Sequence, residues 1–239
     1  MAEVYRLPAS GGAESPRFKS YAGAARSGEP VTHFNPMTSK PAGETVEALL
    51  GVGAEAVAAE AATAVLDELG AGQEVELVMF VTVATPGMWT DRVATEVEHR
   101  LGGQRDLELL FWTGEQIDAA TVVRRARGQA VRAAWWAVDG DRRDTVRAAV
   151  AREGIALAVS RDGPVPRDDT AVADAVELLG SKAGFGDRAC VVFGDRVAAA
   201  MGFTPLGLGD LAGARHGAAR CEHTDIAAAF ASGPAAPWL

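Results

Sequence analysis

The stretch VELVMFVTVA, residues 75–84, is a nearly continuous apolar run that is rich in β-branched residues. A run of this length and composition is typical of a strand that is covered on both faces, as in a parallel sheet. Thr85-Pro86-Gly87 follows it directly, and proline and glycine favour a turn rather than a continued strand. We therefore predict a buried strand over 75–84.

Helical and strand-like patterns alternate through much of the remaining chain. Over residues 54–69, apolar residues recur at helical spacing, with Val57, Ala61 and Val65 on one face. Further helices are predicted over 90–101, 114–127, 141–152 and 170–179. Further strands are predicted over 4–7, 106–112, 131–138, 155–160 and 189–193. Strands that alternate with helices are typical of an α/β fold, in which helices flank a mainly parallel sheet.

Length and composition limit the domain organisation and the class of partner. The chain has 239 residues, of which 48% are hydrophobic, and this is sufficient for a buried core. Residues 8–45 are rich in Gly, Ser and Pro, so we predict an irregular N-terminal arm over 1–45 and a single domain over 46–239. A net charge of −9 without a basic stripe argues against a nucleic-acid partner.

The sequence also bears on the compartment. The N-terminus lacks the basic start and apolar run of a secretory signal, and the apolar stretches have strand length rather than the length of a membrane span. The two cysteines, Cys190 and Cys221, do not form a disulfide framework. We expect a cytoplasmic protein without a membrane partner.

Five segments occur in an order that resembles one known family. They are AVAAEAATAVLDELG at 56–70, VELVMFVTVATPG at 75–87, VEHRLGG at 97–103, RARGQAVRAAWWAV at 125–138 and VVFGDRVAAAMG at 191–202. In pattern, order and spacing they resemble the N-terminal half of β-ketoacyl synthases of the acyl-carrier-protein synthase III type. The resemblance implies a thiolase-like half, with a mixed, mainly parallel five-stranded sheet flanked by helices and a central buried helix. Relative to that family, residues 141–186 form an insertion that we expect to hold a helix–strand–helix.

The family's catalytic cysteine has no counterpart at the corresponding position. In the family this nucleophile lies where a strand meets a helix, and the matching residues here are Phe111, Trp112, Thr113 and Gly114. The indole of Trp112 only donates a hydrogen bond and cannot act as a nucleophile. The condensing activity therefore does not carry over. Either these four residues fill an inactive site, or they line a substrate pocket.

The resemblance also suggests partners. The chain is too short for the family's second half, and half of such a domain leaves a sheet edge exposed, which favours a homo- or hetero-oligomer. The implied function is a non-catalytic ketosynthase-like subunit that pairs with a condensing enzyme or with itself in polyketide or fatty-acyl biosynthesis. An acyl carrier protein or acyl-CoA is a candidate ligand, and no cofactor is expected.

The predicted helix over 114–127 is unusually polar. Burial of six charged or amide side chains without partners costs several kcal/mol or more. We therefore expect this helix to lie at a surface or a polar interface, with Ile117, Ala120 and either Val123 or Thr121 facing inward. The six polar residues are Glu115, Gln116, Asp118, Arg124, Arg125 and Arg127.

The segment ARHGAARCEHTD, residues 214–225, concentrates reactive side chains. On a strand, Cys221 and His223 would share one face. Because a cysteine–histidine pair can supply a nucleophile and its base, the alternative function is an acyltransferase or hydrolase that uses Cys221 with His223 or His216. Zinc binding that includes His216 or Asp225 is a weaker alternative, because the spacing matches no established zinc motif. We favour an ordinary loop with a strand end.

The polar segment THFNPMTSKPAGE, residues 32–44, suggests either a solvated arm or a loop that clasps an anionic ligand or partner. The chain has no P-loop, no dinucleotide-binding glycine motif after a strand, and no HExxH or GxSxG motif. Five side chains of the segment could donate hydrogen bonds: His33, Asn35, Thr38, Ser39 and Lys40.

Overall fold

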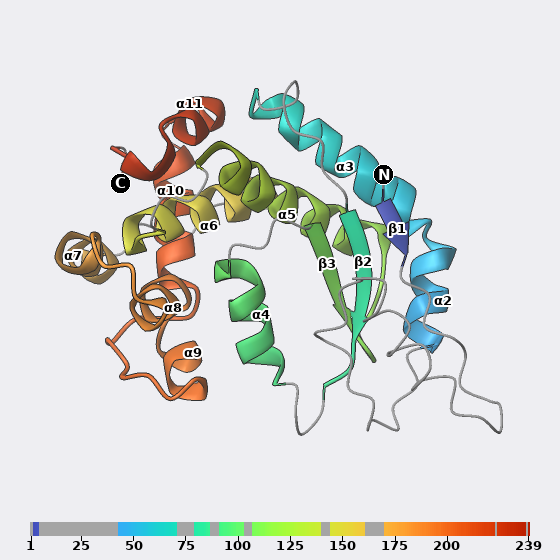
Figure 1. The fold of residues 1–239 in the computed structure, drawn as a ribbon, viewed down its shortest axis with the longest axis horizontal. Coiled ribbons are helices and arrows are strands. Elements are labelled where there is room, and N and C mark those ends of the chain that lie inside the picture. The colour runs from blue at the N-terminus through green and yellow to red at the C-terminus, as the bar shows by residue number, and fades with distance from the viewer. Residues whose placement is uncertain are drawn as a thin grey trace.

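A small parallel sheet packs beside a larger set of helices in the computed structural model of the chain (Figure 1). The structure describes residues 2–4, 43–70, 79–86, 91–102, 107–139, 144–160, 170–222, 224–237 and 239. The strands are β1 (Ala2–Val4), β2 (Met79–Ala84) and β3 (Leu107–Trp112). The N-terminal helices are α2 (Gly43–Gly51), α3 (Ala54–Glu68), α4 (Arg92–Leu101) and α5 (Ala119–Asp139). The C-terminal helices are α6 (Val146–Ser160), α7 (Thr170–Leu179), α8 (Phe185–Phe193), α9 (Asp195–Ala200), α10 (Ala212–Glu222) and α11 (Ile226–Ala231), followed by the 3-10 turn η1 (Gly233–Ala235).

The sheet has the strand order β1-β2-β3, and both pairs of neighbours are parallel. Strands β2 and β3 pair from Met79 opposite Leu107 to Ala84 opposite Trp112. Val81 and Phe111 belong to the main hydrophobic core, whereas Ala84 and Trp112 pack with Leu110 in a separate buried cluster. Because successive side chains of a strand point to opposite faces, both faces of the sheet are covered, as the apolar run predicts.

Helix α6 is buried around nearly its whole circumference. It packs against α5 on one side and α10 on another, and a helix of this kind belongs in a core rather than at a surface. Its contact with α10 is made through two glycines, Gly154 and Gly217. A Cβ added at Gly154 would lie 2.5 Å from the Gly217 carbonyl carbon. We call this pair the α6–α10 glycine contact.

The α/β class is confirmed in its coarse form, as a parallel sheet with helices. The helices predicted over 54–69 and 170–179 are α3 and α7, and the strands predicted over 75–84 and 106–112 correspond to β2 and β3 within the described residues. The arm predicted over 1–45 falls largely outside the described residues, as does most of the 32–44 segment, whose last two residues begin α2.

Three strand predictions were wrong. Residues 131–138 continue α5, residues 155–160 end α6, and residues 189–193 end α8. The runs at 131–138 and 155–160 are rich in alanine, which has the highest helix propensity, and a short apolar run alone does not distinguish a buried strand from a buried helix. The described residues therefore hold three strands rather than five, and those within 141–186 form α6, α7 and the start of α8, with helix in place of the strand predicted over 155–160.

Helix α5 also starts and packs differently from the prediction. The Asp118 carboxylate accepts a hydrogen bond of 2.6 Å from the Thr121 backbone N–H, so Asp118 caps the helix and the first helical residue is Ala119. Val122 and Ala126 are buried, whereas Ala120, predicted to face inward, is exposed. The buried face of α5 continues from Val122 and Ala126 through Ala130 and Ala134. Helix α5 packs against α3 and α6.

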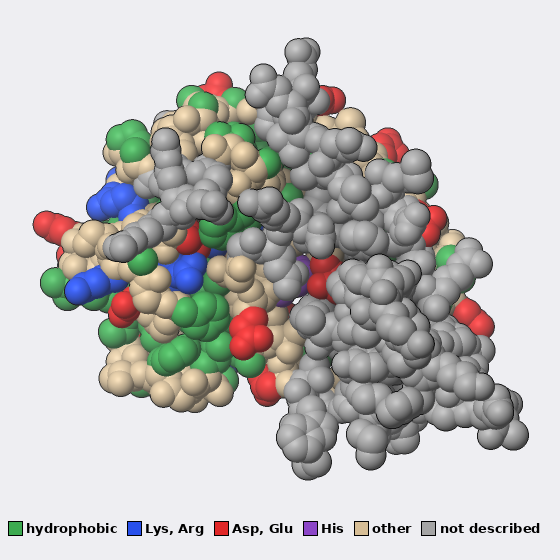
Figure 2. Space-filling model, in the orientation of Figure 1, with side chains coloured by type: hydrophobic (Ala, Val, Ile, Leu, Met, Phe, Trp, Pro, Cys, Tyr) green, Lys and Arg blue, Asp and Glu red, His purple; other side chains and the backbone are tan. Residues whose placement is uncertain are grey.

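No single described helix is long and apolar enough to cross a membrane, although α2 and α3 together meet the length and hydropathy limits with a bend of 60° between them. On the face shown in Figure 2, acidic, basic and hydrophobic side chains are interspersed over α7, α8 and α9. The described part of this face has no stripe of a single sign of charge.

Candidate functional site

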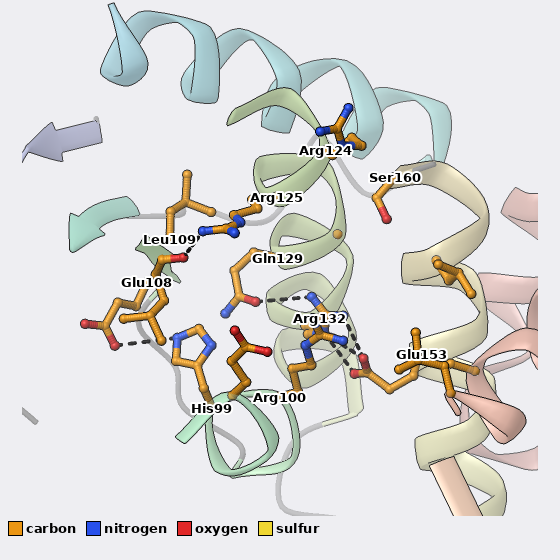
Figure 3. Close-up of a pocket in the computed structure, with 16 residues that line it drawn as sticks. His99, Arg100, Glu108, Leu109, Arg124, Arg125, Gln129, Arg132, Glu153 and Ser160 are labelled. Atoms are coloured by element: carbon orange, nitrogen blue, oxygen red, sulfur yellow. Dashed lines mark hydrogen bonds and ion pairs between the residues drawn. The ribbon is translucent and has the colours of Figure 1, made fainter. Parts of the chain in front are cut away.

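A pocket of about 260 Å³ lies between α4, β3, α5 and α6 (Figure 3). Its volume is just below the range of about 300–1,000 Å³ that is typical for drug-sized ligands, so it suits a small molecule. Its polar lining is Glu96, His99, Arg100, Glu108, Arg124, Arg125, Gln129, Arg132, Glu153 and Ser160. Its apolar lining includes Leu109, Leu110, Leu157, Leu211 and Ala214. We call it the arginine pocket.

One face of α5 supplies much of the polar lining. Arg125, Gln129 and Arg132 are spaced by four and three residues and therefore lie on one side of the helix. Gly128 lies beside them and carries no side chain. A Cβ at this position would be 3.3 Å from an Arg132 Nη atom and 3.5 Å from the Ser160 Cβ, so the glycine allows α5 and the end of α6 to approach closely.

Arg132 is held by a buried carboxylate on α6. Its guanidinium donates to both oxygens of Glu153, with distances of 2.8 Å from Nε and 2.6 Å from Nη2. Burial alone would raise the pKa of Glu153, but the positive charges of Arg132, Arg152 and Arg100 outweigh burial and hold this pKa below its ordinary value. Glu153 is therefore ionised at neutral pH.

A chain of buried ions continues from Glu153 away from the pocket. The fully buried Arg152 donates to Asp144 at 2.8 Å and lies 3.4 Å from Glu153. Asp144 also pairs with Arg188 of α8. We call Arg132, Glu153, Arg152, Asp144 and Arg188 the ion network. Since each carboxylate in it contacts two guanidiniums, the network fixes the rear wall of the arginine pocket.

Arg125 is held by β3 and by the loop after it. Its guanidinium donates to the Leu110 carbonyl oxygen and to the Glu115 carboxylate, and it lies 4.5 Å from the centre of the Phe111 ring. The Glu115 carboxylate also accepts from the Trp112 backbone N–H at 3.2 Å. These contacts fix the Arg125 guanidinium against the end of the sheet.

His99 and Glu108 form a buried pair in the pocket wall (Figure 3). The imidazole Nε2 of His99, near the end of α4, lies 3.5 Å from the Glu108 carboxylate on β3. The two side chains are only 7% and 1% exposed. In the sequence, His99 lies near the end of the helix predicted over 90–101, and the structure places it in the pocket wall.

Arg100 differs from the other pocket arginines. Burial and the nearby Arg132 lower the pKa of its guanidinium, although Glu153 and Glu96 act in the opposite direction. The guanidinium carbon lies 5.7 Å from the centre of the Phe193 ring. Among the described side chains, no carboxylate oxygen lies within 4.0 Å of this guanidinium. Arg100 is therefore a partly buried pocket cation without a described carboxylate partner.

The residues predicted from the family's cysteine position lie close to the arginine pocket but do not line it. Phe111 is buried in the main core, and Trp112 is 1% exposed, with the Arg92 guanidinium 5.5 Å from its ring centre. Thr113 is partly buried, and Gly114 is exposed with a φ of +81°. Because α5 begins only at Ala119, Trp112 does not lie at a helix N-terminus. Whether these four residues line another pocket stays a prediction.

Residues 214–222 of the segment belong to helix α10 rather than to the predicted strand end, and the segment ends at Asp225, directly before α11. His216 and Cys221 are both buried, and five positions along a helix place them roughly 140° apart. Burial raises the pKa of the Cys221 thiol to about 12, which disfavours a nucleophilic thiolate. Asp225 caps α11 by accepting from the Ala227 backbone N–H, and His223 lies outside the described residues.

Within the described ranges, no group of three or more His, Cys, Asp or Glu residues is placed to hold a metal ion. Neither a protein-family model, nor a curated protein, nor a solved structure matches the chain. The function is therefore argued from the chemistry of the arginine pocket.

Proposed function

We propose that the chain binds a small anionic molecule in the arginine pocket. The observation that carries this proposal is Arg100, a partly buried cation without a described carboxylate within 4.0 Å. A buried charge is costly unless an opposite charge or hydrogen bonds compensate it. An anionic ligand at Arg100 would supply this compensation, in a chain whose own net charge is −9.

The neighbouring groups support the same proposal. A guanidinium is planar and can donate two parallel hydrogen bonds to a carboxylate or phosphate group. Gln129 and Ser160 add polar groups to the wall, and Leu109 and Leu157 offer apolar surface to the rest of a ligand. The ion network holds Arg132 in place, so the wall near Arg100 is ordered before a ligand arrives.

Calorimetric titration of the whole chain with hexanoate, succinate, inorganic phosphate and hexan-1-ol tests the proposal. We expect heat of binding from at least one anion and none from the alcohol. The variant Arg100→Gln should weaken anion binding at least tenfold. The matched control is Arg196→Gln, because Arg196 is 66% exposed and forms a surface ion pair with Asp210. Equal binding by Arg100→Gln and the unmodified chain, or no binding of any anion, would overturn the proposal.

The resemblance to ketosynthases leads to a separate prediction. A thiolase-like half with a five-stranded sheet would need strands at 131–138, 155–160 and 189–193, and these residues are helical. The proposed function therefore rests on the arginine pocket and not on the resemblance. Pairing with a condensing enzyme stays a prediction, which co-purification of a full-length ketosynthase with the tagged chain would test.

A further inference from the structure

We infer that the ligand of the arginine pocket is a monocarboxylate with a short aliphatic chain, with its carboxylate at Arg100. This inference rests on the proposed function and narrows it to one class of ligand. It follows from three observations on the pocket: its charge count, the surroundings of Arg100 and its apolar wall.

The described charged side chains of the pocket wall carry one more positive than negative charge. Among the described residues, four arginines and three glutamates line it. A ligand with one negative charge therefore balances the described lining side chains, whereas a dianion would leave them with an excess negative charge.

The excess positive charge is at Arg100. Arg132 is bound to Glu153, and Arg125 is bound to Glu115 and to a backbone carbonyl. The Arg124 guanidinium donates to the Thr121 hydroxyl at 2.9 Å. By contrast, Arg100 has an aromatic ring on one side and, among the described residues, no carboxylate within 4.0 Å. Its N–H groups suit a flat acceptor with two oxygens, which is the shape of a carboxylate.

A second negative charge on the ligand would meet carboxylates of the protein. Glu153 and Glu96 are close enough to Arg100 to raise the pKa of its guanidinium, and Glu108 lines the same pocket. A phosphate dianion bound at Arg100 would be repelled by these groups, because like charges in a partly buried site are poorly screened. The surroundings of Arg100 thus favour a carboxylate over a phosphate.

The leucines of the pocket fit an aliphatic chain. Leu109, Leu110, Leu157 and Leu211 line the cavity together with Ala214. A pocket of about 260 Å³ equals the liquid volume of about eight or nine water molecules, which suits a short chain. Burial of each methylene group should raise the affinity about threefold to fourfold until the cavity is filled.

A ligand series on the unmodified whole chain tests the inference by calorimetry at pH 7.5. We expect butyrate to bind about tenfold more weakly than hexanoate, since the two ligands differ by two methylene groups. Hexyl phosphate and hexylammonium should each bind at least tenfold more weakly than hexanoate. Arg100→Gln should reduce hexanoate binding at least tenfold, and Arg196→Gln should leave it unchanged.

The outcomes separate this inference from the proposed function. If hexyl phosphate or inorganic phosphate binds more tightly than hexanoate and loses affinity in Arg100→Gln, the monocarboxylate class is wrong while the anion site stands. Affinity that does not rise from butyrate to hexanoate would overturn the aliphatic part. If no anion binds, both proposals fail. The ligand series needs no variant, so it tests the class of ligand even if Arg100→Gln does not fold.

Discussion

The two sides of helix α6 are both buried, but different physical interactions hold them. Toward α10, Gly154 meets Gly217 so closely that a single methyl group would collide with backbone. Toward α5, the adjacent residue Glu153 forms an ion pair with Arg132 of that helix. The same carboxylate also pairs with Arg152, its neighbour on α6. The first contact depends on shape and the second on ionisation. The two contacts are equally buried, but they should differ in how substitution and pH change the free energy of unfolding.

The largest effect is expected at Glu153. Glu153→Gln removes the carboxylate that binds Arg132 and one of the two that Arg152 contacts, and breaking a buried ion pair on one side costs about 3–5 kcal/mol. Urea unfolding followed by circular dichroism should show this loss in free energy of unfolding. The matched control is Glu68→Gln, because Glu68 pairs with Arg127 at 2.7 Å but is 45% exposed, and should cost less than about 1 kcal/mol. Equal losses in the two variants would contradict the importance of the ion network.

The glycine contact should give the next largest effect. In Gly217→Ala the new Cβ would lie 2.5 Å from the Val150 carbonyl oxygen, which is backbone and cannot rotate away. Overpacking of this kind costs about 1–3 kcal/mol in free energy of unfolding. Gly51→Ala is the control, since nothing lies within 4 Å of its added Cβ and alanine favours a helix. A loss in Gly51→Ala as large as that in Gly217→Ala would mean that close packing is not the cause.

These two contacts also show where sequence patterns suffice and where they fail. The strands over 79–84 and 107–112 are bounded by turn residues and flanked by periodic helices, so the pattern alone identifies them. The runs at 131–138 and 155–160 continue alanine-rich helices, and their apolar letters carry no period that separates strand from helix. Residues 155–160 form a helix that is buried between α5 and α10, and such packing is a tertiary effect that a local sequence pattern does not show.

The same limit explains the candidate site. The sequence placed the polar helix around Arg124 and Arg125 at a surface or polar interface, and these arginines line the pocket. It missed Arg132, because residues 131–138 were predicted as a strand. On a continued helix, the spacing of Arg125, Gln129 and Arg132 would have indicated one polar face. Glu153 carries no such signal, since only the approach of α6 brings it to Arg132.

The pH dependence of stability should sharpen the comparison, with a smaller effect. Because the pKa of Glu153 in the folded protein is below its ordinary value of 4.5, its carboxylate stabilises the fold above about pH 4.5, and this contribution is lost as the pH falls further. The stability of the unmodified chain should therefore fall more steeply below pH 4.5 than that of Glu153→Gln. Urea unfolding from pH 7 to pH 3 measures this. The free energy of unfolding of Gly217→Ala should fall with pH in parallel with that of the unmodified chain. If the two values converge at low pH, close packing is not the cause of the loss in Gly217→Ala.

The smallest effect is expected for the thiol of Cys221. This residue lies on α10, the helix that carries Gly217 of the α6–α10 glycine contact. Cys221 lies four residues after Gly217, and burial raises the pKa of its thiol to about 12, so only about one thiol in ten thousand is ionised at pH 8. In a Cys190→Ala background, reaction of the folded chain with an aromatic disulfide reagent should be slow and limited by opening of the structure.

Gly217→Ala loosens α10 directly, whereas Glu153→Gln acts on the side of α6 that faces α5. At matched stability, the reaction should therefore be faster in Gly217→Ala. Rapid labelling of the unmodified Cys221 at pH 8 would instead favour the reactive thiol that the sequence left as an alternative.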